Sequence, residues 1–206
     1  MWRLFRPLRY FTLRNRAKTA MDVAGALTVA LLVVLPFLIV PDASFFRAGG
    51  VLDRLIGLMS ALTGFFVAAL VAAATFAHAD LDRVMTSGAV EMRVLDEDGK
   101  TSWQKMTRRE LACAIFGYLS FAGFVFSVAA AIIVPIASSG PPPPAFLGLA
   151  TGSFLVEQRE SLRIAAMFCV AIPLGHIMTA TALGIYYLME RLHYRKPVVI
   201  SMSDAA

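Results

Sequence analysis

The chain has 206 residues, of which 58% are hydrophobic and 16% are charged, and its net charge is +5. Soluble domains average about 45–50% apolar and about 25% charged residues. The composition therefore excludes an ordinary water-soluble domain and favours a membrane protein whose apolar side chains face lipid. Basic residues beside apolar spans usually face anionic lipid, so the positive charge does not require a nucleic-acid partner.

Residues 1–20 interleave basic side chains with aromatic and aliphatic ones. This composition is typical of a segment that lies among lipid headgroups at the edge of a span. Arginines and aromatic rings can also bind RNA. We prefer the lipid interpretation because it needs no further partner, and we expect no nucleic acid.

Four apolar segments follow, at about residues 23–40, 55–77, 111–136 and 164–189. Each reaches the roughly 17–25 residues that a transmembrane helix needs. We therefore expect residues 1–206 to form a single all-α membrane domain. Its four transmembrane helices would make two hairpins, joined by the polar loop 78–110.

Lys and Arg residues predict the orientation of these spans. Six lie in the N-terminal segment, six in the 78–110 loop and three in the C-terminal tail, against four on the other side. Cytoplasmic loops carry the excess of Lys and Arg. The count predicts a multi-pass protein of the bacterial inner membrane with both termini and the loop in the cytoplasm.

Within the loop, residues 90–95 and 101–105 have the alternation of two short strands around a turn. A small hairpin or an irregular loop would both fit this pattern. Thr107 and Glu110 have capping-box spacing, which places the start of the third helix there. We expect the loop to dock a cytoplasmic protein partner, with these candidate contacts: Arg83, Arg93, Asp96, Glu97, Asp98, Lys100, Trp103, Arg108 and Arg109.

Two spans carry stripes of small residues at helical spacing. Small residues let helix backbones approach closely in lipid, where no hydrophobic force drives helices together. The stripes predict either contacts among the helices of one chain or a face for homo-oligomerisation. Their members are Ser60, Gly64, Ala68 and Ala72 in the second span, and Gly123, Ser127 and Ala131 in the third.

The fourth span contains Pro173, Gly175 and His176. Proline removes a helical hydrogen bond and favours a kink. His176 is then either a gate beside this kink or a neutral histidine that bonds a carbonyl freed by Pro173. The spans, as bounded above, contain no Asp, Glu, Lys or Arg, which argues against an ion-coupled transporter.

His78, Asp80 and Asp82 could hold a divalent metal. We prefer to interpret these residues as a solvated helix end, because no other ligand cluster is obvious in the sequence. The chain also lacks a nucleophile elbow, a P-loop, a dinucleotide fingerprint and a zinc-protease motif. We therefore expect no enzymatic activity, no metal and no cofactor.

The segment HADLDRVM, followed by MTRREL running into FGYLSFAGF, resembles small four-span bacterial inner-membrane proteins that accompany antiviral defence systems. This resemblance implies a membrane-acting module that a cytoplasmic partner regulates. We therefore hypothesise an oligomeric membrane effector or pore-type subunit. The alternatives are a membrane anchor that recruits a cytoplasmic complex and a small-solute transporter.

Overall fold

The computed structural model describes residues 2–13, 15–40, 43–76, 81–82, 84, 90–95, 101–139 and 159–186. Within these residues the helices are η1 (Trp2–Thr12, a 3₁₀-helix), α1 (Arg16–Ile39), α2 (Val51–Thr75), α3 (Arg108–Ser138) and α6 (Arg159–Tyr186). The strands are β1 (Glu91–Leu95) and β2 (Thr101–Lys105). Helices α1, α2, α3 and α6 are all long and apolar enough to cross a membrane. The prediction of an all-α polytopic membrane fold is confirmed.

The helices begin three to seven residues before the predicted spans, and in α1 and α3 a capping side chain marks the start. Asn15 caps α1 by accepting a hydrogen bond from the backbone N–H of Lys18. Thr107 and Glu110 form the predicted capping box of α3. Both groups satisfy backbone N–H donors that lack a helical partner. The charged residues just before each predicted span therefore form the first turns of the helices.

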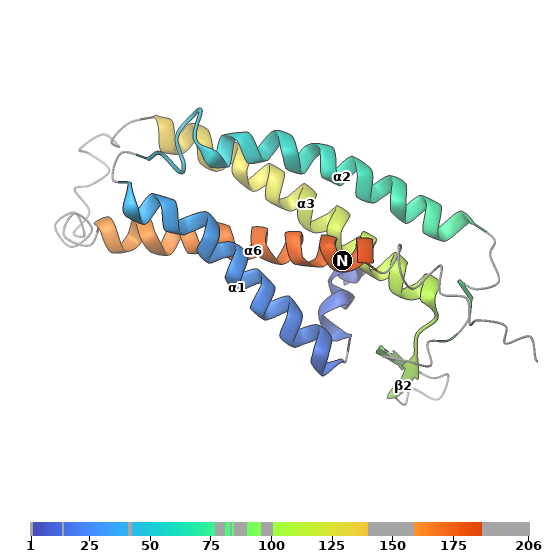
Figure 1. The fold of residues 1–206 in the computed structure, drawn as a ribbon. Helices are drawn as coiled ribbons and strands as arrows, with labels where there is room; N and C mark the ends of the chain where they lie inside the picture. Colours follow the sequence, from blue (N-terminus) through green and yellow to red (C-terminus); the bar gives the residue numbers. More distant parts are fainter. Residues whose placement is uncertain are drawn as a thin grey trace, which may run out of the picture.

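The four long helices pack most extensively as two pairs, α2 with α3 and α1 with α6, while α3 also contacts α6 and η1 (Figure 1). The consecutive helix pairs, α1 with α2 and α3 with α6, pack less extensively than these two pairs. The first and last long helices of the chain lie side by side in space (Figure 1). η1, the hairpin and the first turns of α1 and α3 lie at one end of the bundle, called the hairpin end below.

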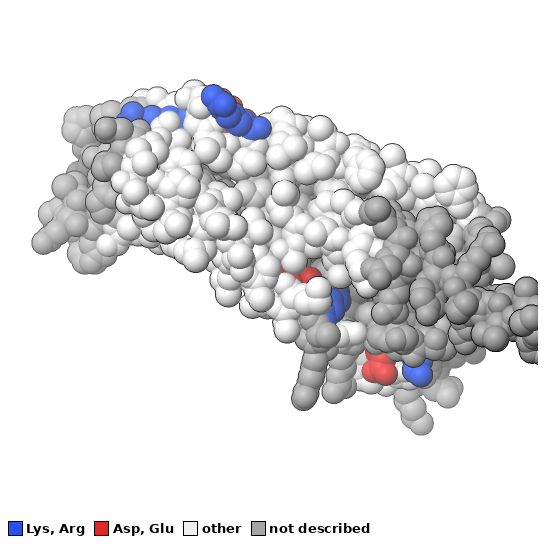
Figure 2. Space-filling view, in the orientation of Figure 1, with Lys and Arg blue, Asp and Glu red and all other residues white. Residues whose placement is uncertain are grey.

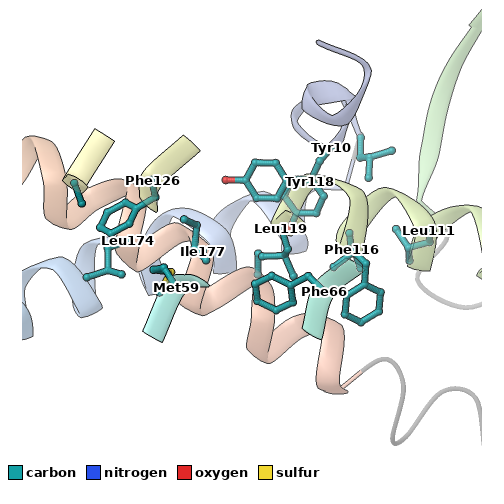
Figure 3. Packing of buried hydrophobic residues seen from close by; sticks show 14 of the residues in the cluster. Tyr10, Met59, Phe66, Leu111, Phe116, Tyr118, Leu119, Phe126, Leu174 and Ile177 are labelled. Carbon is teal, nitrogen blue, oxygen red and sulfur yellow. The ribbon is translucent and has the colours of Figure 1, made fainter. Parts of the chain in front are cut away.

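Apolar side chains of η1, α2, α3 and α6 meet in the main buried cluster (Figure 3), and α1 shares a second, smaller cluster with α6. Helix α2 contributes Leu52, Met59, Phe66 and Ala73, spaced seven residues apart. A seven-residue repeat keeps one face of a helix against its neighbour along the whole contact. Many other large apolar side chains on the helices are exposed, as lipid-facing residues of a membrane protein are. Figure 2 shows a broad uncharged surface over the middle of the helices.

The small-residue stripe of the second span does not lie on this contact face. Ser60, Gly64 and Ala68 are exposed, and Ala72 is half-buried. A Cβ added at Gly64 would meet no atom within 4 Å. Because the α2 contacts to α3 are made by the larger residues of the opposite face, packing within the chain does not explain this stripe.

The stripe of the third span is divided between the interior and the surface. Gly123 is buried against the side chain of Thr63 on α2, so the close approach predicted for a small residue occurs there. Ser127 is half-buried, and its hydroxyl oxygen is buried without a hydrogen-bond partner. Ala131 is exposed. The third-span stripe therefore contributes to helix packing fully at Gly123 and partly at Ser127.

The 78–110 loop contains the small hairpin that its sequence pattern suggested. β1 and β2 pair antiparallel, with Arg93 opposite Trp103. A bridge between Val84 and Thr107 and a hydrogen bond from the Met106 N–H to the Val90 carbonyl fasten the hairpin to the start of α3. The hairpin is therefore attached directly to the first turn of a transmembrane helix.

Candidate functional site

Asp22 is the one charged residue classed as buried in the part of the chain that the structure describes, with 6% of its surface exposed. It lies on α1, four residues after Lys18. The Lys18 ammonium is 2.7 Å from a carboxylate oxygen of Asp22. The predicted span 23–40 itself contains no charge, but α1 begins at Arg16 and so includes Lys18 and Asp22 in the helix that continues as this span.

Tyr10 of η1 completes the surroundings of Asp22. Its hydroxyl donates to the two carboxylate oxygens of Asp22 at 3.1 and 3.2 Å. The ammonium of Lys18 also lies 3.6 Å from the centre of the Tyr10 ring, at the distance of a cation–π contact. Pairing and hydrogen bonding together offset the cost of burying a carboxylate.

The aromatic ring of Tyr10 also links Asp22 and Lys18 to residues of α3 and α6. It stacks on Tyr118, with ring centroids 4.7 Å apart and an interplanar angle of 10° (Figure 3). The Tyr118 hydroxyl lies 2.7 Å from Nδ1 of His176 on α6, a hydrogen-bond distance. Phe11 covers both side chains, with ring centroids 5.1 Å from each. Residues of η1, α1, α3 and α6 therefore meet in one group, Tyr10, Lys18, Asp22, Tyr118 and His176, called the tyrosine cluster below.

Burial and the neighbouring carboxylate of Asp22 raise the pKa of Tyr10 far above its usual range. The tyrosine is therefore held in its neutral, proton-donating form. Since only the neutral phenol can donate to Asp22, its protonation state and its docking on α1 are coupled.

The other two candidate gate residues lie beside His176 with different surroundings. Gly175 packs against the backbone carbonyl of Ala26 so closely that a Cβ would collide with it. Pro173 lies inside α6 and is exposed. His176 directs Nδ1 to Tyr118 and not to a carbonyl freed by Pro173. The imidazole therefore contributes to the contact between α6 and α3.

Four of the proposed docking-loop residues lie in the described part of the chain, and for two of them, Trp103 and Arg109, the structure shows more than their position in a strand or helix. Trp103 on β2 is 48% exposed. Arg109 bonds both carboxylate oxygens of Asp82, at 2.8 and 3.1 Å, and donates to the Ala74 carbonyl at 3.2 Å. These bonds join the end of α2 to the start of α3. Arg108 opens α3, and Arg93 lies on β1. Arg83, Asp96, Glu97, Asp98 and Lys100 fall outside the described residues.

The hydrogen bonds from Arg109 also bear on the predicted metal site at Asp82. Its carboxylate is occupied by Arg109, and both His78 and Asp80 fall outside the described residues. Among the residues that are described, no group of three or more His, Cys, Asp or Glu side chains could hold a metal ion. The hydrogen bonds of Asp82 within the chain give it a structural role.

Sequence reasoning missed Tyr10, Lys18, Asp22 and Tyr118. One signal was available, since Lys18 and Asp22 are four residues apart and would face each other on a helix. The helix start at Arg16 was not recognised, so the pair was placed outside the span. The contact of Tyr10 with Tyr118 joins residues 108 positions apart and leaves no local pattern.

The tyrosine cluster holds hydrogen-bonding and titratable groups that can couple the position of η1 to the packing of three helices. No family model, curated protein or solved structure matches the chain.

Proposed function

We propose that this protein is an oligomeric membrane effector of the bacterial inner membrane, held in a closed state by the docking of η1 on the tyrosine cluster. The observation that carries this proposal is the burial of Tyr10 between Asp22 and Tyr118. Charged groups inside membrane helices are costly and usually functional. A buried carboxylate whose partner comes from a separate terminal segment supports a regulated contact.

Release of η1 is the proposed activating step. It would remove the phenol from Asp22, admit water to Asp22 and Lys18, and uncover the Tyr118–His176 contact between α3 and α6. Because η1 carries no span of its own, a cytoplasmic partner can move it without extracting a helix from lipid. Cytoplasmic termini, predicted from the distribution of Lys and Arg, place η1 within reach of such a partner.

Oligomerisation is supported by the exposed small-residue stripe of α2. Ser60, Gly64 and Ala68 face away from the contacts within the chain. A flat face of small residues suits helix–helix association in lipid. A permeation path would then form between copies of the chain. A role in antiviral defence rests on the resemblance of HADLDRVM and MTRREL alone.

Dye release from liposomes tests the proposal. Purified wild-type protein, Tyr10→Ala and Thr12→Ala are reconstituted at equal density into liposomes loaded with a fluorescent dye. Thr12 is the matched control, because it lies in the same segment and its hydroxyl bonds only the local Arg9 carbonyl among the contacts described. We expect Tyr10→Ala to release dye at least about tenfold faster, a lower limit that corresponds to about 1.4 kcal/mol of lost docking. Equal release by folded, correctly inserted Tyr10→Ala and wild type would reject the proposal.

His176→Phe tests whether the cluster extends to α6. The substitution keeps an aromatic ring but removes the bond to the Tyr118 hydroxyl. Faster release than wild type would place His176 in the closed-state contact. Unchanged release with normal folding would remove the gate role and leave η1 docking to Tyr10 and Asp22 alone.

A membrane anchor is the second candidate. It is favoured by the hairpin, which presents Trp103 beside the start of α3 with 48% of its surface exposed. Exposed aromatic side chains are enriched among residues that dominate protein interfaces. Replacing residues 83–106 with a neutral linker should then abolish capture of a soluble complex, while dye release from liposomes stays at its wild-type rate.

A further inference from the structure

A groove of about 800 Å³ lies at the hairpin end, between η1, α1 and β2. Its wall changes character along α1. Asn15 and Thr19 line the part nearest η1, while Val23, Ala24 and Leu27 line the part farther along the helix. Trp103 of β2 closes one side. Phe11 and Leu13 also line the end nearest η1, so the groove carries its polar groups at that end and is apolar along the rest.

We propose that this groove binds one anionic phospholipid. Its polar end would receive the phosphate headgroup and its apolar part the upper acyl chain. The proposal concerns a ligand of the resting protein, and it does not depend on the effector function proposed above.

The dimensions of the groove suit a lipid. Asn15 and Leu27 are twelve residues apart, which is about 18 Å along a helix. One leaflet contributes about half of the 30 Å hydrocarbon core. The lined stretch of α1 thus matches one headgroup and the length of chain that crosses a single leaflet. A water-soluble ligand would not extend along α1 into the apolar, membrane-spanning part of the groove.

Charge selects an anionic headgroup over a zwitterionic one. Residues 1–20 contain six Lys and Arg and no Asp or Glu; Lys18 is paired with Asp22, so five basic residues lie outside this ion pair. Arg14 and Arg16 flank the groove residue Asn15 in sequence. The start of α1 adds the partial positive charge of a helix N-terminus. Each basic residue near an anionic membrane surface contributes about 1 kcal/mol.

Trp103 supplies a built-in reporter, because Trp2 is the chain's one other tryptophan. A Trp2→Phe protein therefore emits from Trp103 alone. This protein is reconstituted into nanodiscs that contain phospholipids with brominated acyl chains, which quench tryptophan on contact. The brominated lipid is phosphatidylglycerol in one series and phosphatidylcholine in the other, at equal mole fraction in an otherwise unlabelled bilayer.

Two further variants are made in the Trp2→Phe background. Ala24→Phe fills the groove with a ring, since Ala24 is exposed and lines it. Ala129→Phe is the matched control, because Ala129 is exposed on α3 and does not line the groove. Both substitutions place the same side chain on a lipid-facing helix surface.

We expect brominated phosphatidylglycerol to quench Trp103 at least about twofold more strongly than brominated phosphatidylcholine at low mole fraction. Ala24→Phe should remove this difference and Ala129→Phe should retain it. Equal quenching by the two lipids would mean ordinary annular lipid and overturn the proposal. Quenching by neither would mean that acyl chains do not reach the groove, which also overturns it.

A second measurement keeps the proposal testable if Ala24→Phe fails to fold. Native mass spectrometry of the wild-type protein, released from membranes that contain both lipids, should show one retained phosphatidylglycerol per chain. Retention of both lipids in proportion to their abundance would contradict the proposal.

Discussion

Tyr10 and Tyr118 stack with their rings almost parallel, although one belongs to the N-terminal segment and the other lies ten residues into a transmembrane helix. Ten residues correspond to about 15 Å along α3. Residues 1–20 were expected to lie among lipid headgroups. Instead Tyr10 and Leu13, at 0% and 4% exposure, pack into the bundle. Tyr10 and Leu13 of this segment are therefore part of the protein interior.

Tyr10→Phe and Tyr10→Ala should differ in their cost. Phenylalanine keeps the stack on Tyr118 but no longer donates to Asp22, and losing a hydrogen bond to a charged group costs about 1.5–3 kcal/mol. Alanine also loses the buried ring, for a total of about 3–5 kcal/mol. Thermal unfolding in detergent micelles measures both. Equal losses for the two variants would show that the hydroxyl contributes nothing.

Asp22→Asn should destabilise the protein more than Asp53→Asn. Asparagine at position 22 leaves the ammonium of Lys18, which is 10% exposed, without its counter-ion. Breaking a buried ion pair from one side costs about 3–5 kcal/mol. Asp53 is a control of the same type near the start of α2, where it accepts one exposed hydrogen bond from the Gly49 N–H. The double substitution Lys18→Met with Asp22→Asn should recover part of the loss, because it removes the unpaired charge.

Stability should also fall in alkali because of Tyr10. The pKa of Tyr10 is raised in the folded protein by burial first and by Asp22 second. The unfolded chain therefore releases the phenolic proton at a lower pH than the folded protein, near the usual value of about 10. Its contribution to stability is complete below about pH 10 and is lost as the pH rises further, by up to about 1.4 kcal/mol per pH unit. Unfolding midpoints of wild type and Tyr10→Phe between pH 8 and about 11.5 measure this, and equal slopes above pH 10 would contradict it.

The sequence revealed most of the fold because spans and caps are local features. Eighteen or more consecutive apolar residues identify a transmembrane helix without knowledge of its neighbours. The capping box at Thr107 and Glu110 likewise depends on two residues three positions apart. The structure confirms both kinds of prediction.

The tyrosine cluster could not be predicted in the same way. Tyr10 meets Tyr118 only because α3 and α1 both pack beside η1, which depends on how the helices are arranged in space. Periodicity also did not reveal which stripe on α2 is buried. Small residues and large apolar residues recur on opposite faces of this helix, and either set could have formed the contact with α3.

Gly175→Ala should destabilise the contact between α1 and α6. A methyl group at this position collides with the Ala26 carbonyl, which belongs to backbone and cannot rotate away. Overpacking of this kind costs about 1–3 kcal/mol. Gly57→Ala is the matched control, because a Cβ there meets no atom within 4 Å. The control should unfold at the wild-type temperature or slightly above it, since alanine favours a helix over glycine.

Bulky substitutions on the exposed stripe of α2 should separate self-association from folding. Gly64→Leu adds a side chain to a surface that touches no other part of the described chain within 4 Å of the new Cβ. The monomer should therefore fold normally, whereas a close helix–helix contact between copies would be forced apart. Gly123→Leu is the contrasting variant, because it would collide with Thr63 and unfold the pair of α2 and α3. We expect Gly64→Leu to shift the protein to smaller assemblies in light scattering of detergent-solubilised samples, at an unchanged unfolding temperature. An unchanged assembly size would move the interface between copies away from α2.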